Sequence, residues 1–177
     1  MQDNPLIALI ISTIIAGEAV AGIPGTPIKQ AFQPTMQGVN SQPTAYLYKI
    51  GDRRTGFVSR NDAWQTNRMV HTESQIYETT FQISALATQN PNTPNQYTAS
   101  DILNLIASIL QSSQAIAAFE AQGVGVERVS DIRNPYFQDD RQQNEAAPSM
   151  DVVFSHSQII TSTMPIVTTT ELNIITV

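Results

Sequence analysis

The sequence predicts an α/β fold of the α+β type: a mixed, mostly antiparallel sheet with two main helices packed on it. Residues 6–16 (LIALIISTIIA) form an apolar run at helical spacing. Residues 75–87 alternate between apolar and polar side chains, which is typical of a half-buried strand. Residues 102–116 carry a second apolar stripe at helical spacing. The length of 177 residues fits a single domain, which we expect to span residues 1–177.

The first helix is expected at about residues 5–21. Asn4 followed by Pro5 is typical of a helix start, and Gly22 with Pro24-Gly25 is typical of a helix end. The predicted core face carries Leu6, Ile10 and Ile14, flanked by Ile7, Ile11 and Ile15, whereas Ser12, Thr13 and Glu18 are expected off that face.

The same segment imitates a targeting signal. Ala19-Val20-Ala21 resembles a cleavage site, but a secretory signal needs a basic start, and the first positive charge here is Lys29. The run is also shorter than the roughly 20 apolar residues of a membrane-spanning helix. We therefore predict a packed helix, with a cleaved signal and a membrane-associated helix as the alternatives.

A long hairpin arm is expected at about residues 44–87. A short extended stretch at 28–33 and a loop at 34–43 precede it. Residues 44–50 (TAYLYKI) are rich in strand-forming residues, and GDRRTG at 51–56 is a polar turn or an extension of the strand. Pairing 44–58 with 70–87 predicts a hairpin that reaches past an ordinary sheet and crosses onto a neighbouring molecule.

The second helix is expected at about residues 99–122. Thr98 and Asp101 resemble a capping box, and Gly123 is typical of a helix end. Small residues on its other faces predict close approach to the sheet or to the first helix. The predicted buried stripe consists of Ile102, Leu105, Ile106, Ile109 and Ile116.

Strands are expected over the C-terminal part, at about residues 124–177. Residues 124–132 and 150–156 each have a strand pattern, and the polar stretch 138–149 separates them. The tail from Ile159 to Val177 consists mostly of Ile, Val and Thr. We interpret this β-rich tail as an edge strand, or as a strand that augments a neighbouring subunit.

Composition excludes several functional classes. The formal net charge of −6 argues against binding nucleic acid by phosphate neutralisation. The absence of cysteine excludes disulfides, thiolate metal sites and cysteine nucleophiles. Charged residues make up only 14 % of the chain, and neutral polar residues replace them, which favours contacts with other proteins.

The search for chemistry predicts no catalytic residue, cofactor site or metal site. His71 and Glu73 could hold a metal, but they lack a third ligand nearby. His156 has no nucleophile motif, and Gly123-Val124-Gly125 leads from helix to strand, the reverse of a phosphate-binding loop. Asp139-Asp140 lie beside Arg141 in a polar loop and are interpreted as solvated or salt-bridged.

Residues suited to inter-subunit or partner contacts are easier to find. Arg53 and Arg54 form a doubled basic site that could meet phosphate or, as we favour, an acidic neighbour. Trp64, expected in a loop, is either a core plug or a subunit anchor. The full set of candidate contact residues is Arg53, Arg54, Trp64, Arg133, Tyr136, Phe137, Asp140, Ile174, Ile175 and Val177.

Several stretches, taken in order, resemble the neck and tail-terminator family of contractile-tailed bacteriophages. After the N-terminal helix these are QAFQPT at 30–35, YLYKIGDRRTGF at 46–57, MVHTESQIYETTFQISALA at 69–87, TASDILNLIASILQS at 98–112, GVGVERVSDIRNPYFQDDR at 123–141 and PSMDVVFSH at 148–156. The resemblance covers essentially the whole chain, and none of these motifs is catalytic.

The resemblance implies a structural virion protein and no enzyme. Its subunits would form a ring, expected to be a hexamer, that caps the tail tube and sheath and joins the tail to the head connector. DNA would pass through the lumen as cargo, and acidic lumen residues would repel it from the wall. Assembly would take place in the host cytoplasm, with the tail tube, sheath and neck proteins as partners and no membrane.

Three alternatives remain open from the sequence. The first is a dodecameric head–tail connector or gateway protein of the same neck. The second is a secreted binding module, if the N-terminal run is cleaved. The third is a small hydrolase built on His71, His156 and the acidic loop, which requires these groups to meet in one pocket.

Overall fold

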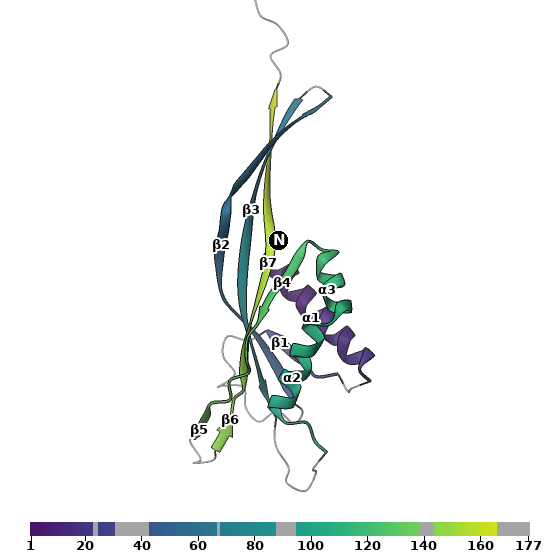
Figure 1. Ribbon diagram of the computed structural model, residues 1–177, viewed down its shortest axis with the longest axis vertical. Coiled ribbons are helices and arrows are strands. Elements are labelled where there is room, and N and C mark those ends of the chain that lie inside the picture. The colour runs from purple at the N-terminus through teal and green to yellow at the C-terminus, as the bar shows by residue number, and fades with distance from the viewer. Residues whose placement is uncertain (23–24, 31–42, 67, 88–94, 139–143, 166–177) are drawn as a thin grey trace, which may run out of the picture.

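The computed structural model describes residues 1–22, 25–30, 43–66, 68–87, 95–138 and 144–165. Figure 1 shows a helical layer on one face of a sheet, whose three longest strands extend well beyond the helices. The elements are α1 (Asp3–Val20), β1 (Ile28–Gln30), β2 (Thr44–Gln65), β3 (Arg68–Leu86), α2 (Ala99–Leu110), α3 (Ser113–Glu120), β4 (Val124–Val129), β5 (Tyr136–Gln138), β6 (Asn144–Ala146) and β7 (Ser149–Pro165). The α+β class is confirmed.

The main sheet has the strand order β1-β2-β3-β7-β4. Among the strands that the structure describes, only the β1–β2 pair is parallel and the other pairs are antiparallel, which fits the predicted mixed, mostly antiparallel sheet. β5 and β6 form a separate two-stranded sheet. β2, β3 and β7 contain 22, 19 and 17 residues, against roughly 5–6 in an average strand, so their far ends lie beyond the helical layer.

We call the far part of this sheet the arm. It consists of residues 55–65 of β2, 68–76 of β3 and 157–165 of β7, which pair beyond the end of β4. The remainder of the main sheet, with the three helices, is the base. The core of the molecule lies in the base, between the helices and the face of the sheet that carries Phe81, Ile83 and Phe154.

Helix α1 packs into the core, as predicted. It is long and apolar enough to cross a membrane by length and composition alone, yet Leu6, Ile10 and Ile14 are completely buried in the core cluster. The predicted start of the helix at Asn4-Pro5 was wrong. The helix begins at Asp3 after an extended Gln2, so Asn4 and Pro5 lie within its first turn, where proline is tolerated.

Thr13 and Glu18 were also expected off the apolar face, and they are buried. α1 contacts α2 and α3 in addition to the core. The side of α1 that carries Thr13 and Glu18 is therefore covered as well. The carboxylate of Glu18 accepts a hydrogen bond from the backbone N–H of Thr26 at 2.8 Å. The chain that follows the helix therefore folds back over this side of it.

The second helix is interrupted, which the sequence did not predict. Thr98 and Asp101 form the expected capping box at the start of α2. The side chain of Ser112 accepts a hydrogen bond from the N–H of Ala115 and begins α3, which is bent by 58° from α2. Ile102, Ile106 and Ile109 are buried as predicted, whereas Leu105 is half-buried and Ile116 is exposed because the break turns α3.

Close contact between the first two helices occurs at Gly17 of α1. A Cβ atom built there would lie 2.3 Å from Cγ2 of Ile109 in α2. The absence of a side chain at Gly17 therefore allows this approach. Close approach was predicted from small residues of the second helix, whereas the small residue at this contact belongs to α1.

The hairpin has the predicted bounds, but its strands pair further toward the turn than the predicted 44–58 and 70–87. β3 has the expected alternation, with Thr79, Phe81, Ile83 and Ala85 completely buried. The GDRRTG segment is part of β2, with register shifts between Lys49 and Gly51 and between Thr55 and Ser59. Trp64 belongs to β2 rather than to a loop, because the pairing with β3 continues to Gln65.

The tail is partly used within the chain. Residues 159–165 of β7 pair with β3, and beyond β4 this part of β7 is an edge of the described sheet, as one of the two interpretations predicted. Residues 166–177 lie outside the described part of the chain.

Candidate assembly surface

A polar network lies where the base meets the arm. Lys49 contacts Asp3 at 2.7 Å and Asp52 at 2.6 Å. The Thr79 hydroxyl donates to Asp52 at 2.7 Å, and its oxygen lies 2.9 Å from Nε2 of His156. These side chains come from α1, β2, β3 and β7, so the network joins one helix to all three strands that continue into the arm.

The hydrogen bonds fix the state of His156. Because the Thr79 hydroxyl donates to Asp52, Nε2 of His156 must be the donor to Thr79, and Nδ1 is then an acceptor in the neutral ring. The amino group of Met1 lies 3.2 Å from Nδ1 and donates to the carbonyl of Ser157 at 2.8 Å. Burial, followed by the charge of this amino group, lowers the pKa of His156.

The carboxylate and ammonium of the network stay charged. Burial opposes the charge of Asp52, but hydrogen bonds from Lys49 and Thr79 outweigh it and lower the pKa. Burial likewise opposes the charge of Lys49, but its bonds to Asp3 and Asp52 raise the pKa. The network therefore holds a fixed ion pair beside a neutral histidine.

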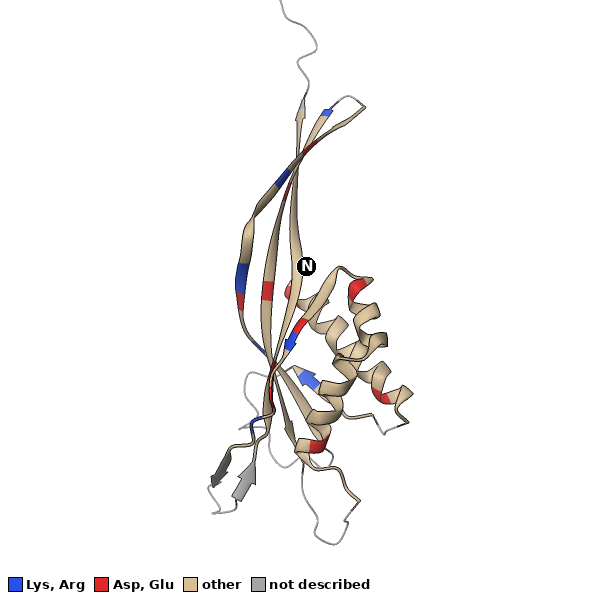
Figure 2. Ribbon diagram, in the orientation of Figure 1, with Lys and Arg blue, Asp and Glu red and all other residues tan. Residues whose placement is uncertain are grey.

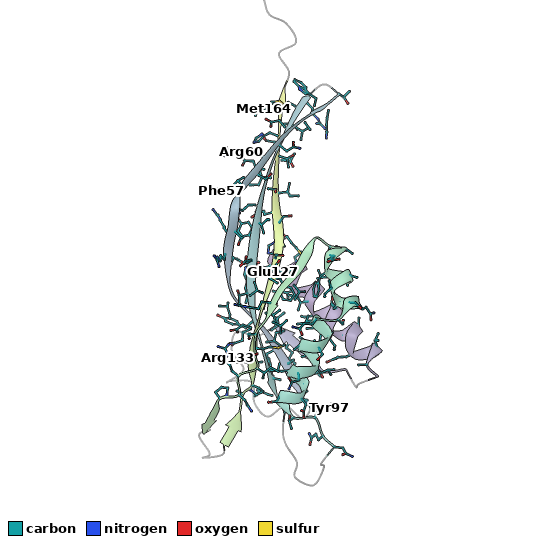
Figure 3. All side chains as sticks on the ribbon, in the orientation of Figure 1. Phe57, Arg60, Tyr97, Glu127, Arg133 and Met164 are labelled. Atoms are coloured by element: carbon teal, nitrogen blue, oxygen red, sulfur yellow. The ribbon has the colours of Figure 1, made fainter. Side chains whose placement is uncertain are left out.

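The arm exposes large apolar side chains instead of burying them. Among its described residues only Val70 is buried. Phe57 is fully exposed and Trp64 is 70 % exposed; Val58, Ile76, Ile159, Ile160 and Met164 are also exposed. Figure 3 shows Phe57 on β2 and Met164 near the end of β7. Such a concentration of exposed apolar groups marks an interaction surface.

The pleat of the arm separates two faces with different chemistry. The helix-side face continues the face that the helices cover in the base. At the tip it carries the cross-strand row Trp64, Met69 and Met164. Next to this row, His71 contacts Asp62 and lies 3.4 Å from Glu73, which pairs with Arg60 at 3.0 Å. The hydrogen bonds that His71 donates to Asp62 and then to Glu73 raise the pKa of His71.

We call the opposite side of the arm the hydroxyl face. By register it carries the rows Thr55–Ile76–Ser157, Ser59–Ser74–Ile159, Asn61–Thr72–Thr161 and Ala63–Val70–Thr163. None of these residues carries a charge. The next row toward the tip pairs Gln65 with Arg68, so Arg68 is the charged residue that register places on this face of the arm. The carboxylates Asp62 and Glu73 both lie on the helix-side face, so below the tip the hydroxyl face presents a neutral surface of small polar groups and isoleucines.

The two long edges of the arm are open within the described part of the chain. β1 pairs with β2 only at residues 45–47, and β4 pairs with β7 only at residues 152–156. The outer side of β2 is therefore unpaired with another strand along the arm, and so is the outer side of β7 beyond Ser157, whose carbonyl accepts a hydrogen bond from the amino group of Met1. Figure 2 shows that β7 carries no charged residue along this length.

The predicted contact residues whose side chains are described lie at three places. Arg53 and Arg54 lie on β2 rather than on a turn, with Arg53 opposite Glu78 and the Arg54 guanidinium 5.8 Å from the ring centre of Tyr77. Arg133 binds Asp151 of β7 at 2.6 Å. Trp64 lies at the tip of the arm, so the core-plug interpretation is wrong, while its role as a subunit anchor stays a prediction.

The remaining contact candidates cannot be placed by their side chains. Tyr136 and Phe137 belong to β5, where only the backbone pairing with β6 is described. Asp140, Ile174, Ile175 and Val177 lie outside the described residues, as does Asp139.

The two histidines do not converge in a catalytic pocket. His71 is opposite Ser162, whereas His156 lies six residues earlier on β7, a separation of about 20 Å at roughly 3.3 Å per residue. Over the described residues, no group of three or more potential ligands is arranged to hold a metal ion. A groove of about 240 Å³ between α1 and the α2–α3 pair is lined mainly by small and apolar residues such as Ala16, Gly17 and Ala118.

The sequence did not indicate the junction network, although it did indicate an edge strand in the tail. Asp52, Thr79 and His156 are far apart in the chain and carry no shared motif. The uncharged run from Val152 to Pro165 is visible in the sequence and could have indicated a strand edge made for pairing.

A family model described as E217 gateway protein gp29 matches residues 5–166, which include the whole arm and almost the whole base. No curated protein matches the chain.

Proposed function

The chain belongs to the family of the E217 gateway protein gp29, a structural family of the phage neck, and on this premise we propose that it forms a ring at the junction of head and tail. The match over residues 5–166 carries this proposal, because it covers the arm together with the base. Ring formation would cover the apolar side chains that the arm exposes in the single chain.

Within the neck we propose the gateway position, between the connector on the head side and the tail. The sequence resemblance favoured a tail terminator and kept the gateway protein as its alternative; the family description supports the alternative. The action is assembly without turnover, and the separation of His71 from His156 offers no support for a hydrolase.

DNA would pass through this ring as cargo. The hydroxyl face of the arm supports that role, because it continues the face of the base that the helical layer leaves uncovered. Below Arg68 at the tip, its rows offer no cations to hold phosphate. The acidic lumen expected from the net charge finds no support here, since Asp62 and Glu73 lie on the helix-side face.

Phage assembly in the absence of this protein tests whether it occupies the gateway position or the tail-terminator position. Without a gateway protein we expect tails of normal length and filled heads that do not join. Without a tail terminator, tails of irregular length would accumulate instead. Electron microscopy of the particles separates the two outcomes, and wild-type yields of joined phage would overturn both.

A further inference from the structure

The two open edges of the arm lie on opposite sides of β3 and at the same position along the length of the arm. Register places Asn61 of β2 and Thr161 of β7 in one row, on either side of Thr72. The same holds without interruption from the Ser59–Ile159 row to the Gln65–Pro165 row, and again at the Thr55–Ser157 row beyond the register shift in β2. Figure 1 shows β2 and β7 on the two sides of β3 over this length.

The strands at these edges also run in the same direction. β3 is antiparallel to both β2 and β7, so β2 and β7 are parallel to each other. Rotation about an axis along the arm preserves both height and direction. A ring of identical copies therefore brings the β7 edge of one copy beside the β2 edge of the next as a parallel pair.

The β7 edge lacks the features that normally protect a free strand. Single-chain proteins shield such edges with charges, bulges or proline. Residues 157–164 (SQIITSTM) contain no charge and no proline, and their pairing with β3 shows no bulge. Pro165 comes only at the end of the strand. Such a segment has the composition of a strand that pairs on both sides.

From these relations we infer that β7 of one copy pairs with β2 of the next, so that the arms close into one continuous barrel. This inference rests on the proposed function, because it assigns the contact that closes the ring. The hydroxyl faces then line the barrel. The tip row Trp64, Met69 and Met164 meets the same row of the neighbouring copies and becomes an apolar rim.

Pairs of introduced cysteines test this contact in the full chain, which has no cysteine of its own. Thr161→Cys is combined in turn with Ser59→Cys, Asn61→Cys or Ala63→Cys, all on the hydroxyl face. Within one copy β2 and β7 are two strand spacings apart, about 9–10 Å, which exceeds the roughly 7 Å limit for a disulfide. A disulfide must then link two copies, and testing three positions allows for stagger between strands.

Matched controls combine Thr161→Cys with Arg60→Cys or Asp62→Cys, which lie on the same strand but on the helix-side face. Oxidation of the purified protein and of assembled particles should give a ladder of linked chains for at least one hydroxyl-face pair. We expect a yield at least tenfold above the controls and above Thr161→Cys alone.

Each other outcome has its own meaning. Rings or joined necks without the ladder would overturn the barrel and leave the proposed function intact. A dimer from Thr161→Cys alone, as abundant as the paired products, would show two-fold pairing of β7 with itself and overturn the barrel as well. Absence of the protein from the neck would overturn both the function and the barrel.

Discussion

Thr79 Oγ1 lies 2.9 Å from Nε2 of His156, at the point where the buried face of the sheet becomes the exposed face of the arm. One row further into the base, the same face carries Phe81, which is completely buried. The hydroxyl of Thr79 also donates to Asp52. This threonine therefore links the two outer strands of the arm across β3.

Thr79→Val should destabilise the fold, because it removes both hydrogen bonds and leaves His156 and Asp52 without this partner. We expect a loss of about 1–3 kcal/mol in the free energy of unfolding, measured by urea denaturation. Thr80→Val is the matched control, since Thr80 is the next residue on β3 and lies on the opposite face. An equal effect of the two substitutions would show that the network adds nothing specific.

Acid should weaken the junction through His156. Its pKa is lowered in the folded state, first by burial and then by the amino group of Met1. The unfolded chain therefore takes up the proton first. Stability is complete above the unfolded pKa of about 6.5 and declines as the pH falls below it toward the folded pKa. Asp3, Lys49 and Asp52 are the other charged groups that act on the ring.

His71 should act in the opposite direction, because Asp62 and Glu73 raise its pKa. Its contribution is complete below about pH 6.5 and is lost as the pH rises through the folded pKa. The comparison uses two chains, His71→Gln alone and His71→Gln combined with His156→Gln. We expect the urea midpoints at pH 5.5 and pH 7.5 to differ less in the double variant than in His71→Gln alone. An unchanged difference would assign the acid sensitivity to other groups.

The periodic parts of the fold could be predicted because their signals are local. The stripe Leu6, Ile10 and Ile14 and the capping box at Thr98 each lie within a few turns of one helix. The break at Ser112 was missed because serine is tolerated inside a helix and also caps one. The junction network joins Thr79 to His156, which is 77 positions away, so no local sequence pattern indicates it.

The placement of Trp64 was missed for a related reason. The polar residues around it are typical of a loop when they are read alone. The strand persists there because β3 pairs with β2 up to the turn and β7 pairs with the other side of β3. Tertiary pairing thus overrides a local pattern, as is common for strands.

Gly17→Ala should destabilise the contact between α1 and α2. The new methyl group would lie 2.3 Å from Cγ2 of Ile109, so the Ile109 side chain or one of the two helices must shift. We expect a cost of about 1–3 kcal/mol, as for other overpacked cores, measured as a shift in the urea midpoint. Ile109→Ala in the same chain should make the added methyl group less costly.

Gly51→Ala is the matched control for this substitution, because nothing lies within 4 Å of a Cβ atom built at Gly51. A Gly17→Ala chain as stable as the Gly51→Ala chain would contradict close packing at this helix crossing.

Trp64→Ser should impair ring assembly and leave the single chain intact. The side chain is 70 % exposed, so its removal should change the free energy of unfolding by no more than about 0.5 kcal/mol.

Trp64 is the sole tryptophan, so its fluorescence reports on the tip of the arm directly. In wild type, emission should shift to shorter wavelength as rings form, because the indole leaves water for the apolar rim. Tyr97→Ser, at an exposed residue of the base, is the control and should assemble normally. Rings that form with unchanged emission would place the tip of the arm outside the contact between copies.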